Sequence, residues 1–499
     1  MDFPRKLVKA RAFALNGNQN SSLALYGKLV RHRPNNVDVW LEYAGVAVSA
    51  QRIDLAEMAW AKLEELHGNR SDVLQSLGFQ YQADRRWEKA RQCFTKVADL
   101  DPQHINSRIN LALGYEKSHQ FDQSRSRVEE CLHINPKDDQ ARYLLAFLNV
   151  RSHRLELAES QLRDLIASDP VHEYVRYAAR YKLAEVLDRT QRYDEAIELL
   201  KEAKDIVLVL ADPKILEKQY DWFAKDKLDL ARKLPNNTLQ NWAASVPLKE
   251  RQLTPRIAFI GGHPRSGTTL LEQIMAAHPE VAVIDEPQVL SWAVNSTFSP
   301  MHSYSGDTLN TIRNRYISML LRQAEGYSQG KLLLEKNPSP TAALPILLKL
   351  FPELLVVIAL RDPRDVILSC YFQNFPLNNV NANFLSFERL AKHYADLMDV
   401  WLQVREWSGL NWLETRYEDT VANLEKEGRR VTRFLGLDWN DNQSRFYNAA
   451  KQKQLTSPTY HDVTKPIYSD SVGRWRFYEK HMAAALPALD RFCRILGYS

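Results

Sequence analysis

Apolar residues in the first 204 positions recur in short helical blocks, and the helix breakers between these blocks fall at a constant interval. Pro34, Pro102, Pro136 and Pro170 are separated by 68, 34 and 34 positions, and Gly68 stands in the vacant place. A period of 34 residues predicts a stack of helix–turn–helix units, because each helix pair can bury its apolar face only against its neighbours.

Small residues mark the places where two helices of one unit must cross closely. They occur in pairs twelve positions apart: Ala44 with Ala56, Gly78 with Ala90, Ala112 with Ser124, and Ala146 with Ala158. The unit around Gly78 is similar to the tetratricopeptide repeat (TPR), through Leu74, Leu77, Gly78, Tyr81, Ala90, Phe94 and Pro102. A degenerate first unit and a sixth unit displaced by four residues complete the series, so residues 1–204 predict an all-α TPR superhelix of right-handed sense, with a plain helical bundle as the alternative.

The periodicity is lost after residue 204. Residues 205–255 predict a helical linker, with one charged amphipathic helix over 214–234 followed by a proline-containing stretch. From residue 256 to 499, short apolar runs alternate with helical patterns and predict an α/β domain with a mostly parallel sheet. The predicted strands cover 257–260, 281–284, 332–334 and 354–360. A nucleotide would then bind at the carboxyl ends of the strands.

Composition adds little to this picture. A chain of 499 residues is long enough for two or three domains, and a formal charge of +5 indicates no nucleic-acid partner. The four cysteines are scattered and predict neither a zinc site nor a disulfide framework. No apolar run reaches membrane-spanning length and the first residues do not form a signal peptide, so we expect a cytoplasmic protein without a membrane partner.

The segment 257–271 reads as strand, glycine-rich loop and helix. Gly262, Gly267 and Thr269 match the nucleotide loop G-x-x-x-x-G-K-[ST], but Thr268 stands in place of its lysine. That lysine contacts the terminal phosphates in ATP and GTP enzymes. The loop is therefore predicted to hold a smaller anion through backbone N–H groups, the helix dipole and Arg265.

The core Pro-Arg-Ser-Gly-Thr-Thr-Leu resembles the 5′-phosphosulfate loop of sulfotransferases that use 3′-phosphoadenylyl sulfate (PAPS), in particular the protein-tyrosine sulfotransferase type. This resemblance implies a P-loop-like sulfotransferase domain that takes PAPS as co-substrate and needs no metal. The loop residues that it assigns to the donor are Arg265, Ser266, Gly267, Thr268 and Thr269.

A second anion anchor follows the buried run 354–360. Arg361 and, eight positions later, Ser369 resemble the 3′-phosphate motif of the same superfamily. The tyrosine enzymes carry a further arginine where this chain has Gln373, so one phosphate contact of the family is missing here. Arg364 is expected to pair with Asp362 or Asp365, or to be solvated, rather than to bind the donor.

Two residues at other strand ends are candidates for the chemistry. Glu286 lies where the family carries its carboxylate and is expected to act as general base, with Asp285 as the local alternative. Lys336, in Glu-Lys-Asn-Pro, matches the family lysine and is expected to neutralise the leaving phosphate, the alternative being a simple ion pair with Glu335.

Family resemblance extends toward the C-terminus. Tyr417, in Tyr-Glu-Asp-Thr-Val, is expected near the nucleotide, and Thr459, Lys465 and Arg474 match the loop that closes over PAPS. Thr459 is the fourth expected catalytic residue, with Glu286, Lys336 and Arg265.

Together these patterns predict a PAPS-dependent sulfotransferase acting on an acceptor hydroxyl, with a protein tyrosine bound by the TPR array as the favoured acceptor. A small-molecule or carbohydrate acceptor stays open, as does a TPR scaffold with an inactive sulfotransferase domain. A nucleoside-triphosphate enzyme is disfavoured by Thr268.

Overall fold

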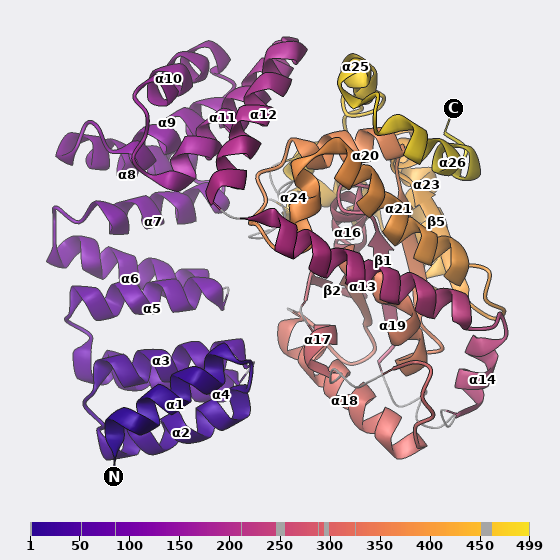
Figure 1. Ribbon diagram of the computed structural model, residues 1–499, viewed down its shortest axis with the longest axis horizontal. Coiled ribbons are helices and arrows are strands. Elements are labelled where there is room, and N and C mark those ends of the chain that lie inside the picture. The colour runs from indigo at the N-terminus through magenta and orange to yellow at the C-terminus, as the bar shows by residue number, and fades with distance from the viewer. Residues whose placement is uncertain are drawn as a thin grey trace. The chain divides into compact units, whose positions relative to one another are not determined.

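The computed structural model describes residues 2–50, 52–84, 86–210, 212–245, 255–287, 289–293, 299–324, 326–450 and 462–498 (Figure 1). The chain divides into two compact units, residues 1–175 and 176–499. Among the residues described, no helix combines the length and the hydropathy that crossing a membrane requires.

The first unit consists of antiparallel helix pairs. Its helices are α1 (Phe3–Leu15), α2 (Gln19–His32), α3 (Val37–Ser49), α4 (Ile53–His67), α5 (Ser71–Ala83), α6 (Trp87–Leu100), α7 (Ile105–Lys117), α8 (Phe121–Ile134), α9 (Asp139–Arg151) and α10 (Leu155–Ala167). The first helix of each pair begins at residue 3, 37, 71, 105 or 139. The predicted period of 34 residues is therefore confirmed, and each predicted helix breaker lies just after the second helix of a pair.

A sixth pair follows, formed by α11 (Glu173–Arg189) and α12 (Tyr193–Leu210). Helix α11 begins on the 34-residue period but has 17 residues, whereas α9 has 13. The expected displacement of four residues is thus taken up by a longer first helix. The boundary between the two compact units falls within α11, so from Arg176 onward this pair belongs to the second unit.

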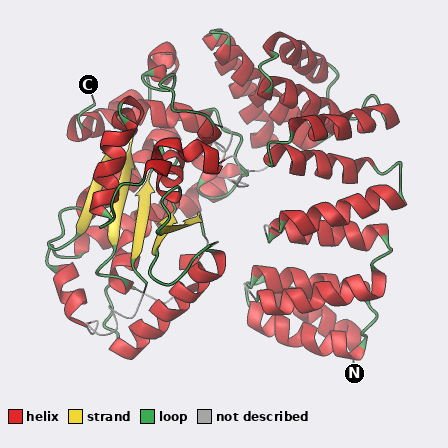
Figure 2. Cartoon of the chain, turned by 180° about the vertical axis from the view of Figure 1, so that it is seen from behind, coloured by secondary structure: helices red, strands yellow, loops and turns green. Residues whose placement is uncertain are grey.

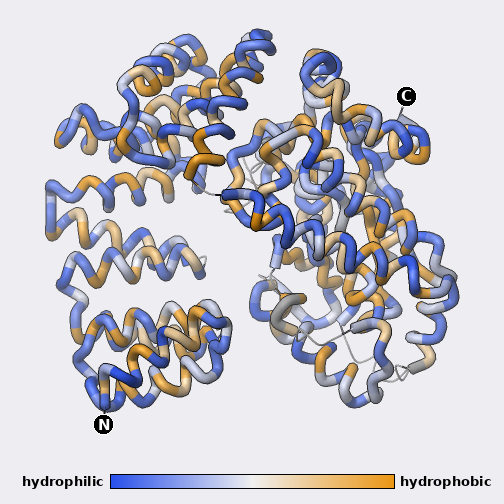
Figure 3. The backbone as a smooth tube through the Cα atoms, viewed as in Figure 1, coloured by the Kyte–Doolittle hydropathy of each residue, from blue (hydrophilic) through white to orange (hydrophobic). Residues whose placement is uncertain are grey.

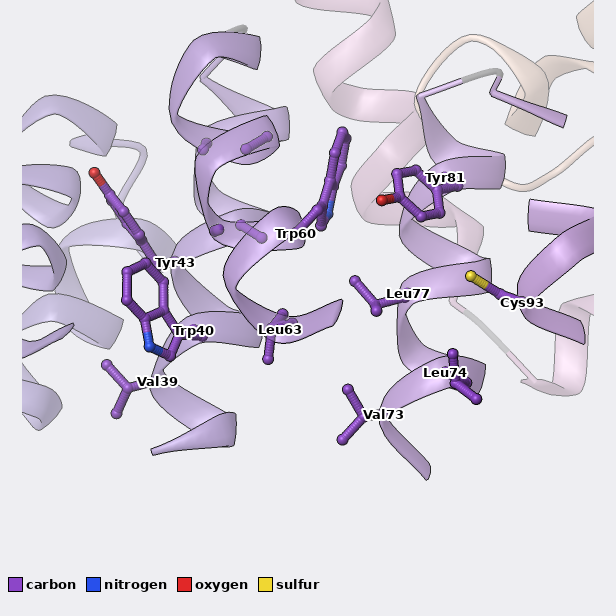
Figure 4. Packing of buried hydrophobic residues seen from close by; sticks show 14 of the residues in the cluster. Val39, Trp40, Tyr43, Trp60, Leu63, Val73, Leu74, Leu77, Tyr81 and Cys93 are labelled. Carbon is purple, nitrogen blue, oxygen red and sulfur yellow. The ribbon is translucent and has the colours of Figure 1, made fainter. Parts of the chain in front are cut away.

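Within a pair, the small residues allow the close crossing that the sequence predicts. A Cβ atom on Gly78 would lie 2.6 Å from the ring of Phe94. Where serine replaces alanine, its hydroxyl finds an acceptor on the partner helix, since Ser124 Oγ donates to the carbonyl of Ala112 at 2.7 Å. Between pairs, Trp60 packs on Tyr81 with ring centroids 4.8 Å apart, in the buried cluster shown in Figure 4.

The second unit is built on one five-stranded parallel sheet. Its strands are β1 (Ile257–Gly262), β2 (Val281–Asp285), β3 (Leu332–Lys336), β4 (Leu355–Leu360) and β5 (Asn411–Arg416), in the order β2-β3-β1-β4-β5. Every neighbouring pair is parallel. The four predicted strands are confirmed, and β5 is an additional edge strand that its largely polar sequence does not predict.

Helices flank this sheet (Figure 2). Those of the second unit that follow α12 are α13 (Pro213–Lys233), α14 (Thr238–Ser245), α16 (Thr268–Ala276), α17 (Val289–Ala293), α18 (Gly306–Gln323), α19 (Leu344–Leu350), α20 (Pro363–Tyr371), α21 (Phe387–Val404), α22 (Tyr417–Ala422), α23 (Leu424–Phe434), α24 (Phe446–Ala450), α25 (Glu479–Met482) and α26 (Leu486–Leu496), with short 3₁₀ turns η1 (Ser339–Ala343), η2 (Asn381–Leu385), η3 (Asp441–Arg445), η4 (Asp462–Thr464) and η5 (Arg474–Tyr478).

Strands β1 to β4 are apolar along most of their length, and orange, hydrophobic stretches of the tube lie in the interior of this unit (Figure 3). Alternate residues of β1 and β3, such as Ala258, Ile260 and Leu334, share one buried cluster with α16, α23 and α24. A sheet buried in this way leaves polar groups at its strand ends, where the chain turns into the next helix.

Candidate active site

Polar residues gather at the carboxyl edge of the parallel sheet. Lys336 ends β3, Glu286 directly follows β2, and Arg361 directly follows β4. In the sheet register, Lys336 is the partner of Ile260 on β1 and of Asp285 on β2. Since all five strands point the same way, residues far apart in sequence are brought to one edge of the sheet.

The loop between β1 and α16 is a backbone cradle. Gly262 and Gly267 have φ angles of 129° and 95°, in the region that favours glycine. A Cβ on Gly262 would lie 2.4 Å from the carbonyl oxygen of Ala359, and one on Gly267 would lie 2.9 Å from the ring of Tyr417. Glycine is therefore required at both positions, because the φ angle disfavours other residues and because a Cβ atom would collide with its neighbours.

Side chains hold this loop in shape. Thr341 Oγ1 accepts from the N–H of Gly262 at 2.8 Å, and Ser266 Oγ donates to the carbonyl of His263 at 2.6 Å. Helix α16 then begins at Thr268, with Thr269 in its first turn. The first N–H groups of a helix have no intrahelical acceptor, so the loop presents them together with the positive end of the helix dipole.

The two predicted anion anchors lie against each other. Arg265 Nε donates to Ser369 Oγ at 3.0 Å, and Arg361 Nη1 donates to the carbonyl of Arg265 at 3.3 Å. The guanidinium of Arg361 also lies over the ring of Tyr417, 4.7 Å from its centroid. Arg265, Arg361, Ser369 and Tyr417 thus form one cluster, although they come from three different parts of the chain.

Arg361 has a buried nitrogen that its surroundings do not satisfy. Its side chain is 7% exposed, and Nε has no hydrogen-bond partner among the residues that the structure describes. A buried N–H without an acceptor is costly. An anionic ligand at this place would supply the acceptor, so the arginine fits a phosphate group.

Lys336 is completely buried within a group of carboxylates. Its Nζ lies 2.5 Å from Oδ1 of Asp285, 2.8 Å from Oε1 of Glu286 and 3.6 Å from Oε2 of Glu272. Burial by itself lowers the pKa of Lys336, but the three carboxylates outweigh it and keep that pKa above its ordinary value. The lysine therefore stays protonated at neutral pH.

Glu286 is the carboxylate of this group that solvent reaches best. Its side chain is 44% exposed, against 17% for Asp285 and 4% for Glu272. Its backbone has a φ of 45°, which is uncommon for a residue with a side chain, and its N–H donates to the carbonyl of Lys336 at 2.8 Å. A strained backbone held in this way presents the carboxylate at the edge of the sheet.

The remaining predicted residues lie in different surroundings. Arg364 pairs with Asp362 through two contacts of 2.9 and 2.7 Å, as expected. Arg474 pairs with Asp188 of α11, with Nε 3.1 Å from Oδ1 and Nη2 2.9 Å from Oδ2. Lys465 is half-buried just after η4. Thr459 lies outside the described residues.

Comparison with known proteins agrees with this geometry. Residues 258–441 match the model of the sulfotransferase family, and residues 148–207 match that of the tetratricopeptide repeat. The chain joins TPR repeats to a sulfotransferase domain. Its relatives include protein-tyrosine sulfotransferases.

The relatives share moderate sequence identity with the chain. It is 27% identical over 331 residues to an uncharacterized Aquifex aeolicus protein, covering 63% of this chain and 41% of that one. It is also 25% identical to protein-tyrosine sulfotransferase A of Caenorhabditis elegans, covering 49% of this chain and 68% of that enzyme. A Danio rerio protein-tyrosine sulfotransferase 1 shares 25% identity over 48% of this chain and 72% of its own length.

Some residues of the sulfotransferase domain were not predicted as part of the site. Glu272 is a buried carboxylate beside Lys336, and its position on the helix after the loop was the one available signal. His263, within the loop itself, is buried with Nε2 2.7 Å from Nδ1 of His393, and burial lowers the pKa of His263 to about 4. Asp365 accepts hydrogen bonds from two backbone N–H groups of the segment 473–475, and local sequence does not reveal this contact.

Proposed function

We propose that this protein is a PAPS-dependent sulfotransferase that moves a sulfuryl group to an acceptor hydroxyl, with a protein or peptide tyrosine as the favoured acceptor. The observation that carries the proposal is the contact between the buried Lys336 and the exposed Glu286. Lys336 ends the strand next to the one that leads into the glycine-rich loop, and this loop lacks the lysine that nucleoside-triphosphate enzymes carry. A base and a fixed cation at the same edge are the two groups that sulfuryl transfer requires.

The donor would be held by two anchors. The backbone of the loop, with Arg265, Ser266, Gly267, Thr268 and Thr269, would bind the 5′-phosphosulfate. Arg361 and Ser369 would bind the 3′-phosphate, and the unsatisfied Nε of Arg361 supports this assignment. Further donor contacts are proposed for Tyr417, Thr459, Lys465 and Arg474.

The chain's own groups would then carry out the transfer. Glu286 accepts the proton of the acceptor hydroxyl while a bond forms between the acceptor oxygen and sulfur. The bond between sulfur and the bridging phosphate oxygen breaks, and adenosine 3′,5′-bisphosphate leaves. Lys336 stabilises the charge that develops on the leaving oxygen, with help from Arg265 and Thr459. No metal ion is needed in this scheme.

Acceptor binding by the TPR array is the second part of the proposal. Phe79, Leu113 and Phe147 occupy the ninth position of α5, α7 and α9, and we name them the apolar ladder. Phe79 is 46% and Leu113 is 39% exposed. Amide side chains lie one helical turn away on the same helix faces: Gln75, Gln82 and Asn110. Exposed apolar side chains interleaved with amides suit an extended peptide.

Two alternative functions make different predictions. A carbohydrate or other small acceptor would use the same base and donor site without the apolar ladder. An inactive scaffold would bind donor without transfer, although the contacts among Glu286, Lys336, Arg265 and Ser369 favour an active domain. The cytoplasmic location predicted from the sequence belongs to the same proposal.

Calorimetry provides the first test. Adenosine 3′,5′-bisphosphate should bind the full chain without magnesium and more tightly than ATP with magnesium. Arg361→Ala should lose this binding, whereas Arg429→Ala, which removes an exposed arginine paired with Glu425, should keep it. Preference for ATP would overturn the proposal.

The base is tested with PAPS and a tyrosine peptide. Glu286→Gln should bind the spent donor normally but lose transfer by about 10² to 10⁴-fold, the usual contribution of general-base catalysis. Asp285→Asn is the matched control, because its carboxylate contacts the same lysine. If Asp285→Asn loses more transfer activity than Glu286→Gln does, the base is Asp285.

A further inference from the structure

The sixth helix pair contacts the C-terminal segment of the sulfotransferase domain. Asp188, near the end of α11, accepts from Arg474 and also from Tyr478 Oη, at 2.6 Å. At the start of α12, Tyr193 stacks on Phe477 with ring centroids 4.8 Å apart and ring planes 14° apart. Helices that continue the TPR series are therefore packed on the segment that carries a proposed donor residue.

The backbone around Arg474 is held from the opposite side. Asp365 on α20 accepts from the N–H of Gly473 at 2.7 Å and from that of Trp475 at 2.8 Å. Arg361 Nη2 donates to the carbonyl of Ser471 at 2.5 Å. The residues that hold segment 471–475 thus belong to the same β4–α20 turn that forms the second anion anchor.

Helix α12 also packs against α20 itself. Lys204 is completely buried, and its Nζ donates to the carbonyl of Phe384 at 2.9 Å and lies 4.0 Å from the ring centroid of Tyr371. Burial lowers the pKa of Lys204 to about 7. Tyr371 is the last residue of α20, two positions after Ser369. The sixth pair therefore contacts both α20, which carries Ser369, and the segment 471–475 beside it.

We infer that the sixth helix pair is a working part of the donor site, and that Asp188 is a positioning residue that orients Arg474 toward the donor. The inference rests on the proposed function. The carboxylate engages Nε and Nη2 of the guanidinium, a two-point contact that fixes its plane. Nη1 takes no part in this two-point contact, so this nitrogen can be offered to an anionic group of the donor.

This role differs from a purely structural ion pair. The Arg474 guanidinium also lies over Phe372, 4.4 Å from its ring centroid, so ring and carboxylate restrict it together. A preorganised arginine loses less conformational freedom when an anion binds. Removing the orienting carboxylate should therefore weaken donor binding, even though it removes a negative charge from the neighbourhood of an anion.

The test is Asp188→Asn in the full chain. Adenosine 3′,5′-bisphosphate should bind about tenfold more weakly, as expected for loss of a charge-assisted contact. The KM for PAPS should rise by a similar factor while kcat stays unchanged. Asp194→Asn is the matched control, because Asp194 lies on α12 and pairs with Lys480 and His481 of the same segment at an exposed site. Its donor affinity should equal that of the wild type.

Arg474→Gln provides the second arm. If Asp188 acts through Arg474, the double variant should bind no more weakly than Arg474→Gln alone, because coupled residues are not additive. Unchanged donor affinity in Asp188→Asn, with only a lower melting temperature, would overturn the inference, as would tighter binding. Failure of the wild-type protein to bind adenosine 3′,5′-bisphosphate would instead overturn the proposed function, so the two failures are distinguishable.

Discussion

The two compact units of this protein differ in how many charged side chains they bury. Among the described residues of the first unit, Glu116 is the one charged side chain that is fully buried, and it pairs with Arg151. The second unit buries many acidic and basic groups, among them Lys204, Glu272, Glu335, Lys336, Arg361 and Asp365. Burying a charge is expensive unless other groups compensate it, so such groups mark places selected for more than stability.

The difference follows from how each unit is built. Each helix pair of the first unit repeats the same small and large apolar positions, and local packing is enough to stabilise it. In the second unit, the strands end at one edge with polar side chains, and the charge of Lys336 there is compensated by carboxylates distant in sequence. Substitutions in the first unit should therefore affect stability alone, whereas substitutions in the second unit should affect stability and chemistry together.

The largest effect is expected for Lys336→Met. Its side chain is similar in length but has no charge, so Asp285 and Glu272 would lose their buried cation. Sulfuryl transfer should fall by about 10² to 10³-fold or more, as for loss of other groups that stabilise transition-state charge. The free energy of unfolding should fall by about 3 to 5 kcal/mol, which urea denaturation would measure. Equal stability of the variant and the wild type would show that the carboxylates do not depend on this lysine.

Gly78→Ala is the corresponding change in the first unit. The new methyl group would meet the ring of buried Phe94 at 2.6 Å, so the free energy of unfolding should fall by about 1 to 3 kcal/mol. Donor binding should be unaffected. Gly45→Ala is the matched control, because a Cβ there has nothing within 4 Å, and it should stabilise its helix by about 0.5 to 1 kcal/mol. If both variants changed the free energy of unfolding in the same direction, this explanation from packing would be wrong.

The pH dependence of stability should depend on a histidine of the second unit. Burial lowers the pKa of His263 to about 4, below its ordinary value of 6.5. Between these values the unfolded chain binds more protons, so stability falls as pH decreases from 6.5 to 4, by up to about 1.4 kcal/mol per pH unit. His263→Gln should make this slope smaller in urea titrations at several pH values, and the rest of the slope comes from the neighbouring His393, whose pKa burial also lowers. His133→Gln, at an exposed site on α8, should leave the slope unchanged.

The smallest effect is expected at the apolar ladder. Phe79→Ser combined with Leu113→Ser should raise the KM for a peptide acceptor by roughly tenfold, since one or two exposed anchors contribute about this much. Turnover of a small phenol should stay the same. Leu157→Ser on α10 is the control, because this residue is 47% exposed but lies on the second helix of its pair. A similar loss with the control would show that the ladder is not the acceptor site.

Much of this organisation could be predicted from the sequence. The 34-residue period specified the helix pairs, since each depends on contacts close in the chain. Gly262, Gly267 and the apolar run before them predicted the loop, because backbone conformation at a tight turn is decided by the residues within it. Strand β5 was missed because its residues are mostly polar and lie at the sheet edge, where burial leaves a weak pattern.

Only the tertiary structure decided which groups meet. Arg265 and Ser369 are 104 residues apart, and Asp188 and Arg474 are 286 apart. Their contacts depend on strand order and on helix packing, which no local period encodes. The sequence by itself therefore determined the repeats, the loop and the residues at the strand ends. The fold determined that Glu272 and Asp285 hold Lys336, and that a helix of the repeat series holds an arginine beside the proposed donor site, because these pairs form only when distant segments pack together.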